Sequence, residues 1–318
     1  MVSGTNDRWL RAGVAIPAAI KVMEPNLVFT NMIKAIREDK NSFMYIESVP
    51  NKSSDAKKKT PPEHLIGGKF PELDYTRPTV TAGLMESNGF SIRLLYDVIQ
   101  QKIEGANEIM KAYEVAGYWL AEWVNNAQAA AMIAGATTPT WTPTDWGTPA
   151  TATPVEDLRK LKYQMRREGY PYRLSDVFVH INNLAELEGY LTHMDISAVK
   201  QQSIYGVPGG TGDSINIPIA GCQVTGLASG ITEGGVLGLD GARLGVETHY
   251  YLDPGHSVMR ASYRTIENGV EVTKNAPNVG IHFRTWEDNE TLDQILQFWV
   301  NQKTVVTQPY SVLYDTGI

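Results

Sequence analysis

The longest regular pattern of hydrophobic and polar positions runs from Ala106 to Ala134. Apolar residues recur there every three or four positions, which is the spacing of one buried face of an α-helix. No proline interrupts the run, Gly135 is placed to end it, and Pro139 follows. The pattern predicts a helix on the order of 40 Å long, at about 1.5 Å per residue, well beyond the usual helix length. The apolar positions are Ile109, Tyr113, Ala116, Leu120, Trp123, Val124, Ala127 and Ala131.

A second pattern, within residues 42–89, predicts a long two-stranded hairpin. Phe43–Val49 has the composition of a β-strand, strand-like residues return at Tyr75–Leu84, and the polar stretch Asn51–Pro62 lies between them. A hairpin of this length is marginal alone in water, so we expect it to pack against another surface. The lysines near its tip fit either a solvated loop or contacts with an acidic patch on a neighbouring subunit. These lysines are Lys57, Lys58, Lys59 and Lys69.

The other segments mix helices and strands without a repeating order. Met1–Pro25 combines glycine, proline, charge and isolated apolar residues, and we expect an extended arm that becomes ordered only against another surface. Because long helices occur with scattered strands and no βαβα rhythm, the predicted fold class is α+β. Helices are expected at Asn26–Arg37, Phe90–Ile103, Pro154–Arg167, Leu184–Leu191 after the cap residues Asn182 and Asn183, and at Asn289–Val305, where a helix runs into a strand. Strands are expected at Leu174–Ile181, Ile217–Val224, Gly235–Leu239, Leu244–Tyr251 and Tyr310–Tyr314.

Composition narrows the class of protein. The chain of 318 residues with 42% hydrophobic content can bury one large core or two modest ones. Its formal net charge of -7 argues against a protein that grips nucleic acid along its own surface, although a container for nucleic acid can be acidic. The single cysteine, Cys222, excludes an internal disulfide and is expected to be a small buried hydrophobe. No signal peptide or membrane-spanning run is evident, so we expect a soluble protein made in the cytoplasm, with no membrane partner.

Candidate chemical motifs are weak. Gly206–Gly212 lacks the Gly-Lys-Ser/Thr ending of a phosphate-binding loop and is expected to be a mobile loop. None of the six histidines lies at metal-ligand spacing from another. The pairs Glu156-Asp157 and Glu287-Asp288 each precede or open an expected helix, where they complement the helix dipole. We therefore predict no catalytic residue, no cofactor and no metal.

The order of these segments resembles the major capsid proteins of tailed phages and related archaeal viruses, which share the Hong Kong 97-type fold. The resemblance covers Ser42–Gly317. The hairpin Phe43–Leu84 is similar to the extended loop (E-loop) of that family, and the rod that ends in Ala129–Gly135 is similar to its spine helix. Val177–Leu187 resembles the strand and helix that open the axial domain (A-domain), while Ile217–Val224 resembles a further family strand with its proline and glycine arranged differently.

The resemblance implies a division of the chain. We expect an N-terminal arm and short helix at 1–41, the E-loop at 42–89, a peripheral domain (P-domain) with the spine helix at 90–173, the A-domain at 174–280 and a return to the P-domain at 281–318. The expected core of the spine helix is Tyr113, Leu120, Trp123 and Val124. The candidate assembly residues are Trp9 and Arg11 in the arm and the four lysines of the hairpin.

The resemblance also implies a function. The resemblance implies a structural protein and not an enzyme. This protein would self-assemble into pentamers and hexamers of an icosahedral shell around double-stranded DNA, without sequence-specific binding. The location is a virion capsid assembled in the host cytoplasm, with scaffold, portal and decoration proteins as partners. No long helical leader precedes the arm, so we expect a separate scaffold or an already processed chain. Some relatives cross-link through a lysine, an asparagine and a glutamate, but the last two fall here near Leu292 and Trp299, so we expect a shell without covalent cross-links.

Three other functions stay open. An encapsulin, which encloses protein cargo, and a gene transfer agent both use the same type of subunit. A soluble α+β enzyme would have its site near Gly206–Gly212 or His249–His256. The contents and size of the assembled particle would separate these alternatives.

Overall fold

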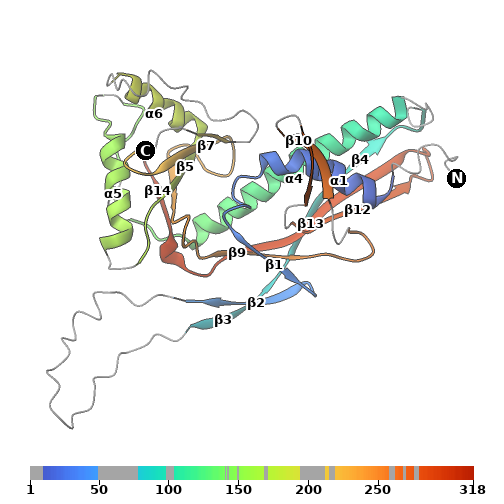
Figure 1. Cartoon of the computed structure of the whole chain (residues 1–318), viewed down its shortest axis with the longest axis horizontal. Coiled ribbons are helices and arrows are strands. Elements are labelled where there is room, and N and C mark those ends of the chain that lie inside the picture. Colours follow the sequence, from blue (N-terminus) through green and yellow to red (C-terminus); the bar gives the residue numbers. More distant parts are fainter. Residues whose placement is uncertain are drawn as a thin grey trace, which may run out of the picture.

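The structure is a computed structural model that describes residues 10–48, 78–97, 104–139, 141, 143–148, 150–167, 171–193, 212–214, 219–257, 262–267, 270–275 and 279–318. It is elongated, with helices and strands distributed along its length and one hairpin projecting from the body (Figure 1). Within the described residues, no helix has the length and apolar character needed to span a bilayer.

A five-stranded sheet forms the centre of the molecule. Its longest strand, β13 (Gln294–Val306), pairs antiparallel with β12 (Ile281–Glu287) and β9 (Val246–Tyr251), and with β4 (Glu86–Leu94) on its other edge. Strand β1 (Lys34–Glu38) adds to β9 in parallel. Thus strands far apart in the sequence meet on β13.

Two helices cover one face of this sheet. The spine helix α4 (Glu104–Gly135, 32 residues) lies along β13, and α1 (Ala12–Met23) packs across α4 (Figure 1). A Cβ atom at Gly117 would lie 2.5 Å from the Ala19 carbonyl oxygen, so α1 can approach α4 this closely because Gly117 has no side chain. The buried residues of this core include Ile16, Ile20, Met23, Tyr113, Leu120, Val124, Phe283, Leu296 and Phe298.

A second five-stranded sheet lies at the other end of the molecule, in the order β14-β8-β5-β7-β6. Helices α5 (Pro154–Arg167) and α6 (Ile181–His193) accompany it, and its core includes Leu158, Leu161, Val177 and Leu187. A third cluster, which contains Met132 of α4 together with Phe178 and Leu237 of the sheet, joins the two halves. The strands are β14 (Val312–Thr316), β8 (Gly235–Leu239), β5 (Asp176–His180), β7 (Gln223–Leu227) and β6 (Gly212–Ser214).

Three smaller features complete the described chain. Strands β2 (Ser42–Glu47) and β3 (Thr79–Leu84) form the projecting hairpin, and β10 (Ser262–Glu267) pairs with β11 (Val270–Asn275). Single turns of 3-10 helix occur at η1 (Glu24–Asn26) and η2 (Pro309–Ser311). The two strands expected at the base of the hairpin are confirmed by β2 and β3. The helices expected at 106–134 and 154–167 and the strands expected at 235–239 and 244–251 are also confirmed, within a few residues.

The helix predicted at 26–37 is wrong, because these residues form turns and then strand β1. The helix predicted at 90–103 is wrong over Phe90 to Leu94, which belong to strand β4, whereas residues 96–97 are helical and 98–103 lie outside the described residues. In β4 the apolar residues Phe90, Ile92 and Leu94 alternate as in a strand, but Ile92, Leu95 and Val98 also have a helical spacing, and the sequence alone does not separate the two. Residues 289–293 form a turn and not a helix, but the strand expected after them is present as β13. Glu287 ends strand β12 and Asp288 begins the β12–β13 connection, so this pair does not open a helix.

The arm is also different from its expectation. Residues 12–23 form α1 in spite of Pro17, and Ala15, Ile16, Ala19, Ile20 and Met23 are buried in the main core. The expected strand 217–224 begins only at Gln223, because Ala220 and Gly221 form a turn with positive φ angles of 52° and 77°. Helix α6 already begins at Ile181, so Asn182 and Asn183 lie in its first turn and do not precede it.

Candidate assembly surfaces

The projecting hairpin has one face that is apolar except for Ser42, which lies opposite Leu84. In its register Met44 lies opposite Ala82 and Ile46 opposite Val80, so these residues and Leu84 share one face. Met44 is 74% exposed and Leu84 71% exposed, and both strands pair only with each other among the described residues. We call this surface the hairpin face; it consists of Met44, Ile46, Val80, Ala82 and Leu84.

The opposite face of the hairpin is anchored at its base. Phe43 is buried and stacks on the imidazole of His249, with ring centroids 4.1 Å apart. His249 Nδ1 in turn lies 2.8 Å from Glu38 Oε1 on β1. The Ser48 N–H donates to the Thr307 carbonyl, which ties the end of β2 to the central sheet. The base is therefore held by the chain's own body, whereas the hairpin face is left uncovered.

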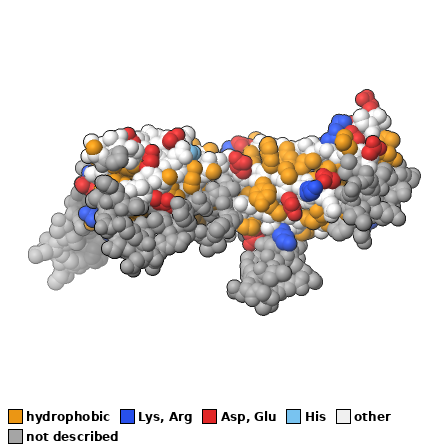
Figure 2. Space-filling view, turned by 90° about the horizontal axis from the view of Figure 1, so that it is seen from above, with side chains coloured by type: hydrophobic (Ala, Val, Ile, Leu, Met, Phe, Trp, Pro, Cys, Tyr) orange, Lys and Arg blue, Asp and Glu red, His pale blue; other side chains and the backbone are white. Residues whose placement is uncertain are grey.

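A second apolar surface lies on the spine helix. Val115, Tyr118 and Trp119 are 48%, 57% and 62% exposed, and the Phe90 ring on β4 lies 5.9 Å from that of Trp119. Figure 2 shows hydrophobic side chains gathered on the part of the molecule where α1 and α4 lie. Exposed aromatic side chains grouped on one surface are typical of protein–protein contacts.

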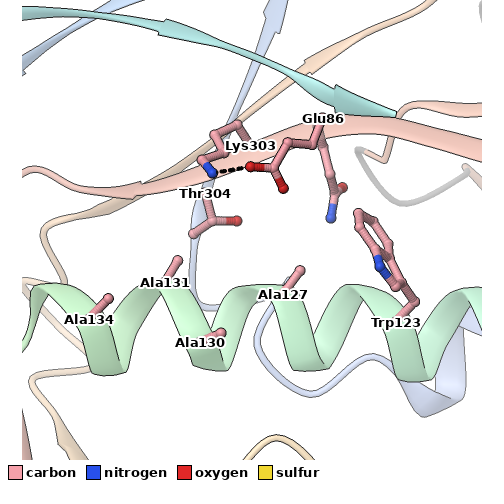
Figure 3. A pocket seen from close by; sticks show the side chains of 9 residues that line it. Glu86, Trp123, Ala127, Ala130, Ala131, Ala134, Lys303 and Thr304 are labelled. Atoms are coloured by element: carbon pink, nitrogen blue, oxygen red, sulfur yellow. Dashed lines mark hydrogen bonds and ion pairs between the residues drawn. The ribbon is translucent and has the colours of Figure 1, made fainter. Parts of the chain in front are cut away.

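A groove continues along the same helix toward its C-terminal end. The groove is a cavity of about 290 Å³ between α4 and β13 (Figure 3). Gln302 of β13 is 2% exposed, and neither its amide nitrogen nor its amide oxygen has a hydrogen-bond partner among the described residues. Glu86 and Lys303 form an ion pair at the rim. The lining residues are Glu86, Trp123, Ala127, Ala130, Ala131, Ala134, Gln302, Lys303 and Thr304.

Most of the predicted assembly residues lie outside the described residues. These are Trp9, Lys57, Lys58, Lys59 and Lys69. Arg11 is exposed and immediately precedes α1 in an extended conformation. The assembly role of all these residues therefore stays a prediction.

Of the spine-helix core residues, Tyr113, Leu120 and Val124 are buried, with Leu120 at 1% exposure. The Tyr113 ring meets those of Phe283 and Phe298 edge-on, and burial raises the pKa of its hydroxyl far above 10. Trp123 is only partly buried and lines the groove. Trp123 therefore lies on the expected face of the helix but is less deeply buried than the sequence predicts.

The buried reactive groups have structural roles. Burial raises the pKa of the Cys222 thiol, which lies 3.7 Å from the Leu174 carbonyl. Asp157 Oδ2 accepts hydrogen bonds from Trp146 Nε1 at 3.1 Å and from the Thr144 hydroxyl at 2.6 Å, so this carboxylate fastens the loop before α5. In the described part of the chain no cluster of His, Cys, Asp and Glu could hold a metal ion.

The positions compared with the cross-linking asparagine and glutamate are Leu292 and Trp299. Leu292 lies in the turn before β13 with a positive φ of 61°, and Trp299 lies within β13, stacked on His282 at 5.1 Å. Neither side chain can form an amide bond with a lysine.

Neither apolar surface is among the assembly residues predicted from the sequence. Met44 and Ile46, like Val80 and Leu84, occupy alternate positions and so predict one apolar strand face. The assembly role was predicted instead for the lysines of the same hairpin. Gln302 carries no signal of its own, because its burial depends on the packing of α4 over β13.

No protein-family description and no curated protein matches the sequence. Among solved structures, the chain is similar to a virus-like particle from Pyrococcus furiosus, with a TM-score of 0.53 and 8% identity over 95% of this chain and 97% of that one. It is also similar to the capsid of cyanophage P-SCSP1u, with a TM-score of 0.52 and 9% identity over 92% and 88% of the two chains. The SrpI encapsulin from Synechococcus elongatus PCC 7942 gives 0.51 and 11% over 91% and 86%.

These likenesses extend over nearly the whole of each chain, so they compare complete folds and not one shared motif. In this chain that fold comprises the hairpin, the long helix and the two sheets. The chain therefore has the Hong Kong 97-type fold of capsid and shell proteins, as the order of its segments predicts.

Proposed function

We propose that this chain is a major capsid protein, which self-assembles into the pentamers and hexamers of an icosahedral shell around double-stranded DNA. The observation that carries the proposal is the hairpin face, five apolar residues on an element that projects from the body. A protein that acted alone would expose this face to water at a cost of about 25 cal/mol per Å² of apolar area. A neighbouring copy can cover it.

The physics of a closed shell suits such contacts. Each copy presents the same surfaces, and symmetric assembly repeats each contact many times. Weak individual contacts then add by multivalency, so a stable shell needs no covalent link. We therefore propose a noncovalent shell, which agrees with the apolar side chains at Leu292 and Trp299.

The role that we propose is structural and not catalytic. Its partners would be further copies of the chain, with scaffold, portal and decoration proteins, in a virion assembled in the host cytoplasm. The net charge of -7 suits a wall that encloses DNA without binding it strongly. The domain boundaries expected from the sequence belong to the same proposal.

A second candidate is an encapsulin-type shell with protein cargo. The similarity to the SrpI encapsulin favours it as much as the phage capsids favour a virus, because the fold is shared. A gene transfer agent would contain DNA like a virus.

The contents of particles purified from the native source test the proposal. Particles treated with nuclease should retain protected double-stranded DNA. Particles that contain a second protein and no DNA would support an encapsulin-type shell instead of a viral capsid. A soluble oligomer with a bound small molecule would contradict both proposals.

A further inference from the structure

Helix α5 and the loop before it enclose a hollow of about 470 Å³ at one end of the molecule (Figure 1). Sites for small ligands commonly have volumes of about 300–1,000 Å³, so this hollow can receive a group of that size. Its lining contains two aromatic rings and two cations and no acidic side chain. The lining residues are Trp141, Lys160, Tyr163, Gln164 and Arg166.

The wall formed by Trp141 is held in place by the fold. Its indole packs against the buried core that α5 also covers, and the Lys160 ammonium lies 4.7 Å from the centroid of its ring. The following loop is fastened to α5, because the N–H of Thr144 donates to Asp157 Oδ2 at 3.1 Å. This side of the hollow is therefore preformed.

The side chain of Tyr163 is the exposed centre of the hollow. It is 62% exposed, although its ring is large and apolar. Lys160 precedes it by three residues and Arg166 follows it by three, and residues three apart are neighbours on the surface of a helix. The Tyr163 ring therefore has a cation on each side along α5.

Both cations are available to a ligand. Lys160 Nζ lies 3.1 Å from Glu156 Oε1, but the two side chains are 43% and 58% exposed, and such exposed ion pairs contribute little. Arg166 is exposed and has no carboxylate partner in the described part of the chain. The hollow is thus a local positive site in a chain whose net charge is -7.

This arrangement selects the chemistry of the ligand. A flat ring can stack on the exposed face of Tyr163, and the cations call for a negative charge on each side of that ring. A nucleotide within a strand has a base as its flat ring and one phosphate on each side. A free mononucleotide has a phosphate on one side only, and an acidic peptide would satisfy the cations but not the ring. The base must be unpaired, because its face is covered by neighbouring bases in a duplex.

We infer that the hollow beside α5 binds an unpaired nucleotide of a nucleic-acid strand, with its base stacked on Tyr163 and its two adjoining phosphates paired with Lys160 and Arg166. This inference goes beyond the proposed function, since a closed shell encloses its contents without such a site. One local contact of this kind is compatible with an acidic wall that does not bind DNA strongly over its whole surface.

Fluorescence anisotropy of the unassembled full chain tests the binding. The probe is a fluorescein-labelled single strand of about ten deoxythymidines. The logarithm of its binding constant should fall with the logarithm of salt concentration with a slope of about -1.4, because each of two phosphate contacts contributes about -0.7. The same strand annealed to its complement should bind at least about fivefold more weakly, and thymidine monophosphate should compete poorly.

Substitutions separate the ring from the charges. Tyr163→Ala should weaken binding of the strand at least about fivefold and leave the salt slope unchanged, whereas Tyr163→Phe should bind as the wild type does. Arg166→Gln should reduce the salt slope to about -0.7. Lys111→Gln is the matched control, because Lys111 is also an exposed helical lysine paired with a glutamate, on α4. It should change neither affinity nor slope.

The outcomes separate this inference from the proposed function. Wild-type affinity in Tyr163→Ala would show that charge alone holds the strand and would overturn the inference. Equal binding of the duplex, equal competition by thymidine monophosphate, or no binding at low salt would overturn it too. Particles that protect DNA without such binding would leave the capsid proposal intact. A chain that binds the strand but never assembles would overturn the capsid proposal alone.

Discussion

Phe43 and His249 stack with their ring centroids 4.1 Å apart and an angle of 16° between the ring planes. The pair fixes the base of the hairpin to β9, while the next residue, Met44, is 74% exposed. One strand thus has an anchored face and a free face. Substitutions on the two faces should have different effects, which allows assembly to be tested separately from folding.

Val80 and Thr79 provide adjacent, matched positions on the two faces of β3. Both are exposed, but only Val80 belongs to the hairpin face. Val80→Asp should change the free energy of unfolding by less than about 0.5 kcal/mol, as is usual for surface positions. It should weaken assembly at least tenfold, because a charge would enter an apolar contact. Thr79→Asp should assemble as the wild type does, and light scattering of both variants checks the difference.

Leu120 and Trp119 form a second matched pair, on the spine helix. Leu120 is 1% exposed in the main core and Trp119 is 62% exposed. Leu120→Asp would bury an unpaired charge and should cost more than about 4 kcal/mol, enough to unfold the subunit. Trp119→Asp should leave the subunit folded. Circular dichroism during thermal unfolding distinguishes them, and a folded Leu120→Asp variant would contradict the assigned core.

His282 predicts a dependence of stability on pH. Its Nδ1–H donates to the Gly280 carbonyl at 2.9 Å, and its Nε2 accepts the Asp253 N–H at 2.8 Å, so the ring is neutral. Burial lowers the pKa of His282 below 6.5. As pH falls, the unfolded chain therefore binds a proton first, at about pH 6.5, and the folded chain only at lower pH.

The contribution of His282 to stability is thus complete above about pH 7 and is lost as pH falls through the interval between the two pKa values. The slope is at most about 1.4 kcal/mol per pH unit for one proton. Chemical denaturation between pH 5 and pH 8 measures it, with His282→Gln for comparison. Equal slopes in the wild type and the variant would show that another group dominates.

Deletion of residues 51–68 tests the tip of the hairpin, which lies outside the described residues. We expect the shortened subunit to keep its fold, because the polar, lysine-rich sequence of this segment offers little apolar surface to bury. Shell formation should be impaired, since the tip is expected to reach a neighbour. Normal shells from the deletion variant would show that the tip has no role between subunits.

The spine helix was predictable because its buried face repeats over many turns and no other structure accounts for that period. Strand β13 was not, because Ile295 and Leu296, like Phe298 and Trp299, are adjacent apolar residues that pack on opposite faces. Without alternation, a short apolar run reads equally as helix or strand. Its burial is set by β4, β9 and β12, which come from distant parts of the sequence.

Helix α1 shows a different limit. An extended arm was expected over this segment, and Pro17 inside the helix removes one backbone hydrogen bond. Packing of Ile16 and Ile20 on α4, permitted by Gly117, offsets that loss. The same limit applies to the candidate surfaces. The hairpin face can be predicted from the alternation of apolar residues. The groove could not be predicted, because it depends on the tertiary position of α4.

Negative-stain electron microscopy of the purified full chain, under conditions that favour assembly, tests the central claim most directly. The account predicts ring-shaped capsomers or closed hollow particles, and it predicts that Val80→Asp reduces their number while Thr79→Asp does not. A field of compact single subunits at every protein concentration would contradict it.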